Sequence, residues 1–193
     1  NIFFTNNDTA YESAISLCNK GIKVEAIIDT REETSSEFAK EAENLGIKIY
    51  RSHTVVDTEG YKRINKITIM ELSKDGQAFN NSEKIMLDCD CLAIAGGWTP
   101  AVHLFTQSGG KLEFRSKDQV FIPNKYPSDQ ISIGSCNGDF ELDEIIKNTS
   151  NTLKKFLDIN KTEYDALNIQ CPKNNEIRNV WLLPSDKIIG KTQ

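Results

Sequence analysis

The chain has 193 residues, of which 38% are hydrophobic and 26% are charged, a composition typical of a folded globular protein rather than a disordered one. Its formal net charge is −5 and its Lys and Arg residues are scattered, which argues against nucleic-acid binding. No stretch approaches the roughly 20 apolar residues of a membrane-spanning helix, so we predict a cytoplasmic protein without a membrane partner. The chain starts at Asn1 rather than Met and at once becomes apolar, and we interpret it as a fragment of a longer protein.

The first 50 residues alternate between strand and helix patterns. The predicted strands are Ile2–Thr5, Ile22–Asp29 and Ile47–Tyr50. One predicted helix runs from a cap at Asn7 or Asp8 to Gly21, and a second runs from a cap at Thr34 or Ser35 to Gly46. The middle strand is almost wholly apolar, as in a strand buried on both faces of a parallel sheet. The alternation predicts right-handed crossovers and a parallel sheet.

From Thr54 to Asp88 the hydrophobic period becomes two. This predicts an antiparallel meander with strands Thr54–Val56, Arg63–Leu72 and Lys84–Leu87 and turns at Glu59–Gly60 and Asp75–Gly76. One face of the meander is predicted to meet water, because its strands contain Lys, Glu and Ser.

The remaining chain returns to short strands and glycine turns. We predict strands at Leu92–Ala95, Lys111–Phe114, Val120–Ile122 and Gln130–Ile133, a short helix over residues 101–107 and an amphipathic helix over residues 141–157. Beyond Asp158 only Val180–Leu183 has a clear pattern. These changes of pattern divide the chain into residues 1–90, residues 91–157 and residues 158–193, and the last of these is predicted to be a connector. The predicted fold class is α/β, with a Rossmann-like nucleotide-binding domain built on a parallel sheet and an antiparallel meander.

Asp29 is the first candidate for binding a cofactor. It ends the second predicted strand, at about the distance from the first turn at which a carboxylate binds the ribose of a dinucleotide. The first turn, Thr5–Ala10, has none of the glycines that let the backbone approach a pyrophosphate, and Asp8 adds a negative charge there. Two interpretations are therefore open, a ribose contact or a loop carboxylate in a domain that keeps the fold and has lost the nucleotide.

Two glycine-containing loops are further candidates. Gly96, Gly97 and Pro100 follow a strand that ends at the carboxyl edge of a sheet, where ligands of open α/β folds bind. The second loop lies between a predicted strand and a helix, so that its N–H groups would face a phosphate or ribose; the candidates are Gly134, Ser135, Asn137 and Gly138. The alternatives are a tight turn with Pro100 at a helix start and a loop that merely tolerates glycine.

No nucleophile, general base or metal site is visible. His53 and His103 have no Ser, Cys or acidic partner at a useful spacing, and we predict structural roles for both. The odd number of cysteines and the absence of C-x-x-C argue against a disulfide framework and a zinc site, so free and mostly buried thiols are expected. Cys89 and Cys91 are predicted to lie buried on one strand face. Any hydride chemistry would then belong to a bound cofactor.

Several phrases of the chain resemble parts of one known family. The phrase Asp90–Pro100 (DCLAIAGGWTP), with the following Ala101–Leu104 and Gln107–Leu112, resembles the return segment of the sarcosine oxidase alpha subunit. The opening residues, Ile2–Asp8, and the end of the second strand, Ile28–Arg31, resemble its inserted nucleotide-type domain. Further similarity is found in Cys136–Gly138 with Phe140 and Leu142, and in Trp181–Pro184. The resemblance implies an inserted NAD-type domain over residues 1–90 and a return segment over residues 91–157, which is the returning part of a second nucleotide domain.

The resemblance implies a bacterial heterotetramer that oxidises the N-methyl group of sarcosine. Its products are glycine, hydrogen peroxide and formaldehyde or, with tetrahydrofolate, the methylene derivative. The alpha subunit would hold NAD and share an FMN site with the beta subunit, which carries FAD; gamma and delta subunits complete the complex. The isolated fragment is expected to be inactive. In the wider fold a Gly-Asp pair binds the FAD ribityl chain, but Ser135 follows Gly134 here, which argues against that contact and leaves NAD allowed in the first domain.

Three alternatives remain open from the sequence. An opine oxidase alpha subunit and an NAD(P)H-dependent disulfide-reductase-like flavoprotein share the architecture, although the latter is disfavoured by the missing C-x-x-C and by Ser135. The third is a non-catalytic scaffold that holds partner subunits, which the glycine-free first turn suggests. The backbone amides exposed in the loops around Gly96 and Gly134 are predicted to border one shared pocket of a nucleotide site, which is completed by parts outside this chain.

Overall fold

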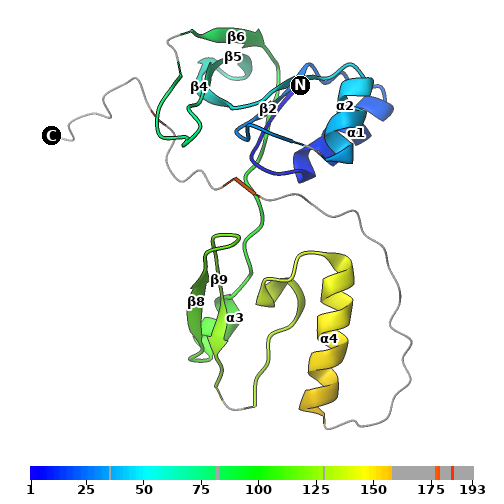
Figure 1. Ribbon diagram of the computed structural model, residues 1–193, viewed down its shortest axis with the longest axis vertical. Helices are drawn as coiled ribbons and strands as arrows, with labels where there is room; N and C mark the ends of the chain where they lie inside the picture. Colours follow the sequence, from blue (N-terminus) through cyan, green and yellow to red (C-terminus); the bar gives the residue numbers. More distant parts are fainter. Residues whose placement is uncertain (35, 81–82, 128, 158–176, 179–183, 185–193) are drawn as a thin grey trace, which may run out of the picture. The chain divides into compact units, whose positions relative to one another are not determined.

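The computed structural model describes residues 1–34, 36–80, 83–127 and 129–157, together with Ile177, Arg178 and Pro184. The chain forms two compact units, one made of Asn1–Gly97 with the segment Asn174–Gln193 and one made of Trp98–Lys173 (Figure 1). The boundary between them lies after Gly97, whereas the sequence predicted a boundary after residue 90. Apart from the three described residues, the predicted connector and its strand Val180–Leu183 lie outside the described residues.

The first unit is built on a parallel sheet with the strand order β3-β2-β1-β7. Its strands are β1 (Ile2–Thr5), β2 (Ala26–Asp29), β3 (Lys48–Tyr50) and β7 (Leu92–Ala95). Each neighbouring pair runs parallel, with Thr5 opposite Asp29 on one side and opposite Ala95 on the other. The predicted parallel sheet is confirmed, although β2 begins at Ala26 and not at Ile22. Strand β7 belongs to this sheet because it pairs with β1, so the observed boundary lies later than predicted.

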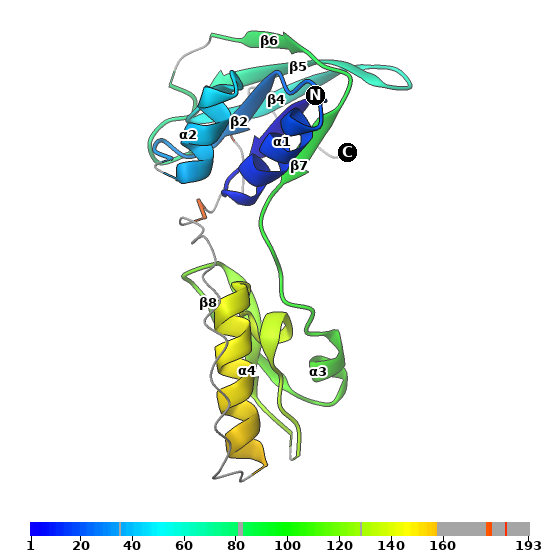
Figure 2. The same cartoon turned by 90° about the vertical axis from the view of Figure 1, so that its right-hand side faces the viewer.

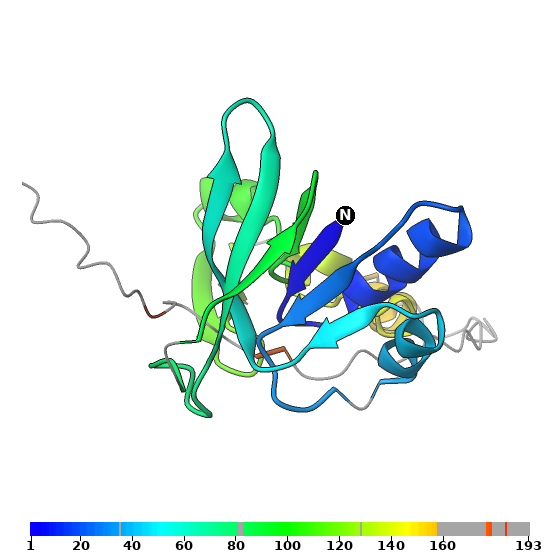
Figure 3. The same ribbon diagram turned by 90° about the horizontal axis from the view of Figure 1, so that it is seen from above.

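Two hydrophobic cores lie on the two faces of this sheet. Side chains alternate along a strand, so that Phe3 and Ile27 pack against the helices α1 (Thr9–Asn19) and α2 (Glu37–Asn44). Ile2 and Ile28 point to the opposite face and pack against the meander. Figure 3 shows the three layers, with the helices on one side of the parallel strands and the meander on the other. The near-continuous apolar strands follow from this double burial.

The meander consists of β4 (His53–Gly60), β5 (Ile64–Glu71) and β6 (Ile85–Asp88), paired antiparallel in that order. This confirms the three predicted strands, but the turn predicted at Glu59–Gly60 is wrong: these residues belong to β4, and the chain turns at residues 61–63. Ile67 and Ile69 of β5 are fully buried against the parallel sheet, which accounts for the period of two in the sequence.

The helix starts differ in part from the prediction, whereas the glycine stops agree with it. Asp8 is the N-cap of α1 as expected, but its side chain makes no capping hydrogen bond, and the N-cap of α2 is Ser36 rather than Thr34 or Ser35. The Ser36 hydroxyl accepts a hydrogen bond from the Ala39 N–H at the start of α2. Gly21 and Gly46 follow α1 and α2 with φ of 80° and 81°, the left-handed conformation that ends many helices. The two predicted stops are therefore confirmed.

The second unit contains the short helix α3 (His103–Gln107), the hairpin β8 (Lys111–Arg115) and β9 (Val120–Lys125), the 3-10 turn η1 (Gly134–Asn137) and the long helix α4 (Leu142–Phe156) (Figure 2). The helices and the hairpin agree with the sequence prediction. The strand predicted at Gln130–Ile133 is wrong: these residues are irregular and lead directly into η1. No strand partner is present for them in the described part of this unit, and a strand needs a neighbour to pair its backbone groups.

The cysteine prediction is only partly confirmed. Cys89 is buried and Cys18 is half-buried, but Cys91 and Cys136 are exposed, and all four are free thiols. Cys89 and Cys91 do not share a strand face, because residues 89–91 precede β7 in irregular structure. No helix among the described residues has the length and apolar character needed to cross a membrane.

Candidate functional site

The carboxyl edge of the parallel sheet is the place where an open α/β fold binds ligands. Thr5, Asp29 and Ala95 end β1, β2 and β7 at this edge. A dinucleotide in such a fold lies across the turn after β1, with its pyrophosphate at the N-terminus of α1 and a ribose near the end of β2. The side chains in these two turns therefore decide whether a nucleotide fits.

Side chains fill the first turn. The Thr5 hydroxyl donates to the Asn7 carbonyl oxygen at 2.9 Å and accepts from the Asn7 N–H at 3.1 Å. The Asn7 amide donates to the Ala95 carbonyl oxygen at 3.1 Å, and its oxygen accepts from the Thr9 N–H at 3.0 Å. Thr5 and Asn7 are both buried. Where a nucleotide-binding turn has glycines, this turn closes on its own side chains.

A buried ion cluster lies directly behind the turn. Arg31 Nη2 lies 2.7 Å from Asp8 Oδ1 and 2.7 Å from Asp29 Oδ2. The side chains of both aspartates are 0% exposed and that of Arg31 is 7% exposed. The Tyr11 hydroxyl donates to Asp29 Oδ2 at 2.8 Å, and the Arg31 N–H donates to Asp29 Oδ1 at 2.9 Å. Both oxygens of Asp29 are thus engaged by neighbouring protein groups.

The cluster fixes the protonation of Tyr11 and Arg31. Burial, followed by the charge of Asp29, raises the pKa of Tyr11, so that its hydroxyl stays a donor. Burial alone would lower the pKa of Arg31, but hydrogen bonds and charge from Asp29 and then Asp8 outweigh burial and raise it. Arg31 is therefore a permanent cation shared between two buried carboxylates.

This geometry favours a structural role for Asp29. Its carboxylate faces Arg31 and Tyr11 and does not reach solvent, so no oxygen is offered to a ribose in this conformation. The buried Asp8 carboxylate also lies beside the turn that would receive a pyrophosphate. The residues present therefore do not fit a dinucleotide bound in the usual way at this edge. The ribose contact itself stays a prediction.

The loop after β7 is open on its first two residues. Gly96 and Gly97 are exposed, and Gly97 has φ +105°, a conformation that favours glycine. A Cβ added at Gly97 would lie 3.7 Å from Ile177 Cδ1. Pro100 is buried and belongs to the second unit, and Trp98 is exposed. The exposed Gly96 and Gly97 are accessible to a ligand, and a cofactor contact at this loop stays a prediction.

The second glycine loop has a structural explanation for its last glycine. Gly138 has φ +84°, its carbonyl oxygen accepts from Arg115 Nη2 at 2.6 Å, and an added Cβ would lie 2.8 Å from Arg115 Nη2 and from Ile122 Cγ2. Asn137 Oδ1 accepts from the Tyr126 hydroxyl at 3.0 Å, while Ser135 is exposed. Because the loop follows no strand, the strand-turn-helix arrangement expected of a phosphate site is wrong here. A contact between this loop and a cofactor stays a prediction, as does the pocket it was expected to share with Gly96.

Three residues at the sheet edge were not identified from the sequence: Tyr11, Arg31 and Arg178. Arg31 had a signal, because it stands two residues after Asp29 with Asp8 at the facing turn. Tyr11 lies on the apolar face of α1, and its position in the sequence indicates an ordinary core residue. Arg178 lies in a stretch without a secondary-structure pattern, and no local signal points to it.

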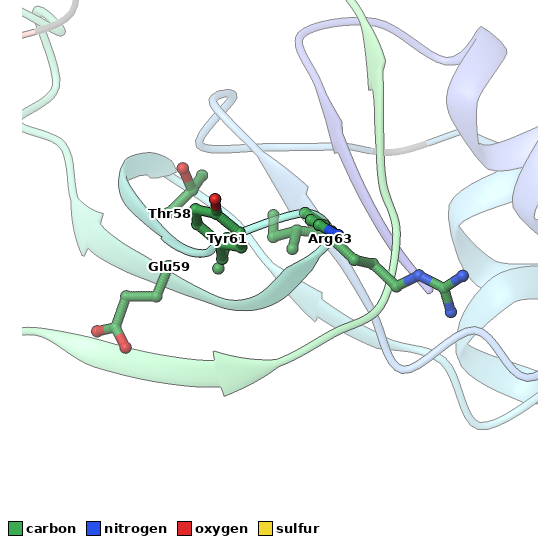
Figure 4. A pocket seen from close by; sticks show the side chains of 7 residues that line it. Thr58, Glu59, Tyr61 and Arg63 are labelled. Atoms are coloured by element: carbon green, nitrogen blue, oxygen red, sulfur yellow. The ribbon is translucent and has the colours of Figure 1, made fainter.

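A shallow pocket of about 230 Å³ lies at the tip of the β4–β5 hairpin (Figure 4). It is lined by Thr58–Ile64, and no predicted site residue is among them. Its polar lining comes from a single turn, so it lacks the convergence of several elements that a binding site needs.

Comparison with known proteins supplies the decisive similarity. No family model matches the chain. It is 31% identical over 192 residues to sarcosine oxidase subunit alpha of Corynebacterium sp. (strain P-1), a match that covers 94% of this chain and 19% of that subunit. The chain resembles a segment of sarcosine oxidase subunit alpha. The same subunit of Corynebacterium sp. (strain U-96) is 27% identical over 186 residues, and that of Rhizobium meliloti (strain 1021) is 33% identical over 119 residues. The resemblance predicted from the sequence is confirmed, and the chain spans about a fifth (19%) of the Corynebacterium sarcosine oxidase subunits that it matches.

Solved structures support the fold. Thioredoxin reductase of Lactococcus lactis has a TM-score of 0.59 at 14% identity, and that of T. acidophilum has 0.54 at 16% identity. Each match covers 81% of this chain and 51% of the solved chain. At these identities the likeness shows the fold alone, and it confirms the predicted α/β, Rossmann-like class.

Proposed function

We propose that this chain is part of the alpha subunit of a flavin-dependent amine oxidase of the sarcosine oxidase type. The observation that carries the proposal is the 31% identity to such a subunit across 94% of the chain. The fold supports it, because a thioredoxin-reductase-like arrangement suits a subunit of a flavin enzyme. The partners in this proposal are beta, gamma and delta subunits, and the location is the cytoplasm.

The proposed reaction removes the N-methyl group of sarcosine. Sarcosine, O₂ and water give glycine, formaldehyde and hydrogen peroxide; tetrahydrofolate, when present, accepts the one-carbon unit. Flavin supplies the oxidising chemistry when bound, with FAD, FMN and NAD as the cofactors of the whole complex. None of the described residues is proposed as catalytic. This chain contributes position and electrostatics.

The cofactor contacts that we propose for this chain are backbone groups of its two glycine loops. They are Gly96, Gly97 and Pro100 in the first loop, and Gly134, Ser135, Asn137 and Gly138 in the second. Exposed backbone at Gly96 and Gly97 supports the first loop. For the second loop the support is weaker, because Gly138 and Asn137 already have partners within the protein. The site would be completed by parts of the subunit outside this chain.

Turnover by the assembled enzyme tests this proposal. The complete subunit is purified with its partners, and hydrogen peroxide and formaldehyde are measured with sarcosine and, separately, with an opine as substrate. Equimolar peroxide and formaldehyde from sarcosine support the proposal. Turnover of the opine alone would assign the chain to an opine oxidase alpha subunit instead.

A second candidate function, a scaffold without nucleotide, is favoured by the buried cluster of Asp8, Arg31 and Asp29. Asp29→Asn separates it from an NAD-binding role, because the amide keeps the shape and removes the charge. If Asp29 binds a ribose, the Kd for NAD rises at least about tenfold in Asp29→Asn, the effect of losing one good hydrogen bond to a charged group. If Asp29 only neutralises Arg31, NAD binding is unchanged and the thermal midpoint falls. Glu12→Gln, at an exposed position of α1, is the matched control.

A further inference from the structure

Arg178 lies at the carboxyl edge of the parallel sheet, although it is far from that sheet in the sequence. It belongs to the first unit, with the segment Asn174–Gln193. Its main chain pairs with Asn6, the residue that follows β1: the Arg178 N–H donates to the Asn6 carbonyl oxygen at 3.1 Å, and the Asn6 side-chain amide donates to the Arg178 carbonyl oxygen at 2.9 Å. Ile177 and Arg178 are drawn in orange beside the ends of the strands in Figure 3.

The guanidinium group of Arg178 binds carbonyl oxygens of two further loops. Nη1 donates to the carbonyl oxygen of Thr30, the residue that follows β2. Nη2 donates to the carbonyl oxygens of Lys74 at 2.8 Å and of Ser73 at 3.3 Å, both in the turn between β5 and β6. A planar guanidinium with five donors suits such a set of diverging acceptors, and an ammonium group does not.

Together Ile177 and Arg178 contact the loop after each of three parallel strands. Asn6 follows β1, Thr30 follows β2, and Gly97, whose added Cβ would lie 3.7 Å from Ile177 Cδ1, follows β7. A dinucleotide at this edge would use the turn after β1 for its pyrophosphate and the end of β2 for its ribose. The Ile177–Arg178 segment and a dinucleotide would therefore occupy the same two turns.

We propose that the carboxyl edge of this sheet is a docking site for the chain's own Ile177–Arg178 segment, which takes the place of a dinucleotide. Two features of the sheet edge fit this exchange. The turn after β1 has no glycine and is closed by its own side chains, and the Asp29 carboxylate is already hydrogen-bonded within the protein. A peptide segment needs backbone acceptors at this edge, and Asn6 and Thr30 present them. The docked segment ties a distant part of the chain to the first unit and closes the turns after β1 and β2 to a dinucleotide.

Trypsin cleavage in the intact subunit tests the docking directly, because trypsin must extract the Arg178 guanidinium from its carbonyl partners. We expect cleavage after Arg178 to be at least about tenfold slower than cleavage after Arg63, since it requires local opening. Arg63 is an exposed arginine at the β4–β5 hairpin tip and serves as the control in the same molecule. Asn6→Ala removes the donor to the Arg178 carbonyl oxygen and should speed cleavage after Arg178, with cleavage after Arg63 unchanged. Equal rates at the two arginines, or no effect of Asn6→Ala, would overturn the proposal.

Hydrogen exchange with added NAD tests the closure. Peptides covering residues 5–9 and 30–33 of the intact subunit are compared with and without saturating NAD. The proposal predicts no change in either peptide, whether or not NAD binds elsewhere in the subunit. Slower exchange of both peptides with NAD would show a dinucleotide at this edge and reject the proposal. Sarcosine turnover is not used as a readout, so failure here is distinct from failure of the proposed function.

Discussion

Arg31 is the residue on which the turns after β1 and β2 depend. It is the cation between two carboxylates that are fully buried, Asp8 and Asp29, each with an oxygen 2.7 Å from its Nη2. Removing two carboxylates from water is costly, and the cation offsets that cost only while it remains in place. Asp29, whose position in the sequence resembles that of a ribose-binding carboxylate, is thus part of a self-contained ion cluster with Arg31 and Asp8.

Replacing Arg31 should be among the most damaging single changes in the first unit. Arg31→Met leaves two buried carboxylates without their cation, and we expect the free energy of unfolding to fall by about 3–5 kcal/mol. Urea unfolding followed by circular dichroism measures this change. Adding Asp8→Asn and Asp29→Asn to Arg31→Met should restore a large part of the loss. A loss below about 1 kcal/mol for Arg31→Met would show that the carboxylates are hydrated or neutral in solution.

Tyr11 should make the stability of the first unit fall at alkaline pH. Its pKa in the folded protein is raised, by burial first and by Asp29 second, above the value of about 10 in an unfolded chain. The contribution of Tyr11 is therefore complete below about pH 10 and is lost as the pH rises toward the folded pKa, because the unfolded chain ionises first. Between pH 8 and pH 10.5, the free energy of unfolding measured in urea should fall by about 1 kcal/mol less in Tyr11→Phe than in the wild type. Tyr61→Phe, at a residue that is 94% exposed, should follow the wild type; equal losses in all three proteins would contradict the prediction.

The cysteines should differ in reactivity according to their burial. Burial raises the pKa of the Cys89 thiol, and Cys89 is itself buried, whereas Cys91 and Cys136 are exposed. In the native protein, iodoacetamide should label Cys91 and Cys136 rapidly and Cys89 slowly, as read by mass spectrometry of the labelled peptides. Labelling in urea, where all thiols react, is the control. Equal native labelling of Cys89 and Cys91 would contradict the burial described here.

Helices, meander strands and the parallel sheet were predicted from local patterns, whereas individual contacts between distant residues were not. The two helices ended by Gly21 and Gly46 and the three meander strands were recognisable because glycine stops and a period of two act within a few residues. Gln130–Ile133 has strand-like residues but no neighbour to pair with in the described unit, and no local pattern reports a missing neighbour. For the candidate site, the carboxyl edge was predictable from strand order. The partners of Asp29 and the arrival of Arg178 were not, because both depend on the folded chain.

Gly138 tests whether the loop before α4 is shaped by the fold or by a ligand. Ala at Gly138 would have φ +84° and its Cβ would lie 2.8 Å from Arg115 Nη2 and Ile122 Cγ2, whereas Ala at Gly109 would have φ +93° and no atom within 4 Å. We expect Gly109→Ala to cost about 1–2 kcal/mol for the left-handed backbone. Gly138→Ala should cost at least about 1 kcal/mol more, because overpacking is added. Hydrogen exchange of β8 and β9 measures both. The opposite order would remove the structural explanation for Gly138.

At the scale of the whole molecule, the two units differ in how much of their surface they bury. The first unit has a core on each face of its parallel sheet, and its strands contain fully buried side chains such as Ile2, Ile28 and Ile67. In the described part of the second unit, Phe105 and Val120 are the large apolar side chains that are buried. Since apolar burial is the main favourable term in folding, the first unit should be much the more stable of the two.

Helix α4 shows the consequence most clearly. It has 15 residues, acidic residues in its first turn and Lys154 and Lys155 in its last, a charge arrangement that suits the helix dipole. None of its residues is buried, and an isolated helix of this length is marginal in water. In the 193-residue chain we therefore expect the amides of α4 to exchange at least about 100-fold faster than those of β5, as measured by hydrogen exchange.

Substitutions should show the same difference between α4 and β5. Leu153→Ala in α4 should lower the free energy of unfolding by less than about 1 kcal/mol, whereas Ile67→Ala in β5 should lower it by about 2–5 kcal/mol. In the proposed alpha subunit, exchange of α4 should slow markedly if the apolar side chains Leu142, Leu153 and Phe156, exposed here, pack against other parts of that subunit. Protection of α4 equal to that of β5 in the chain alone would show that the second unit is stable without further partners.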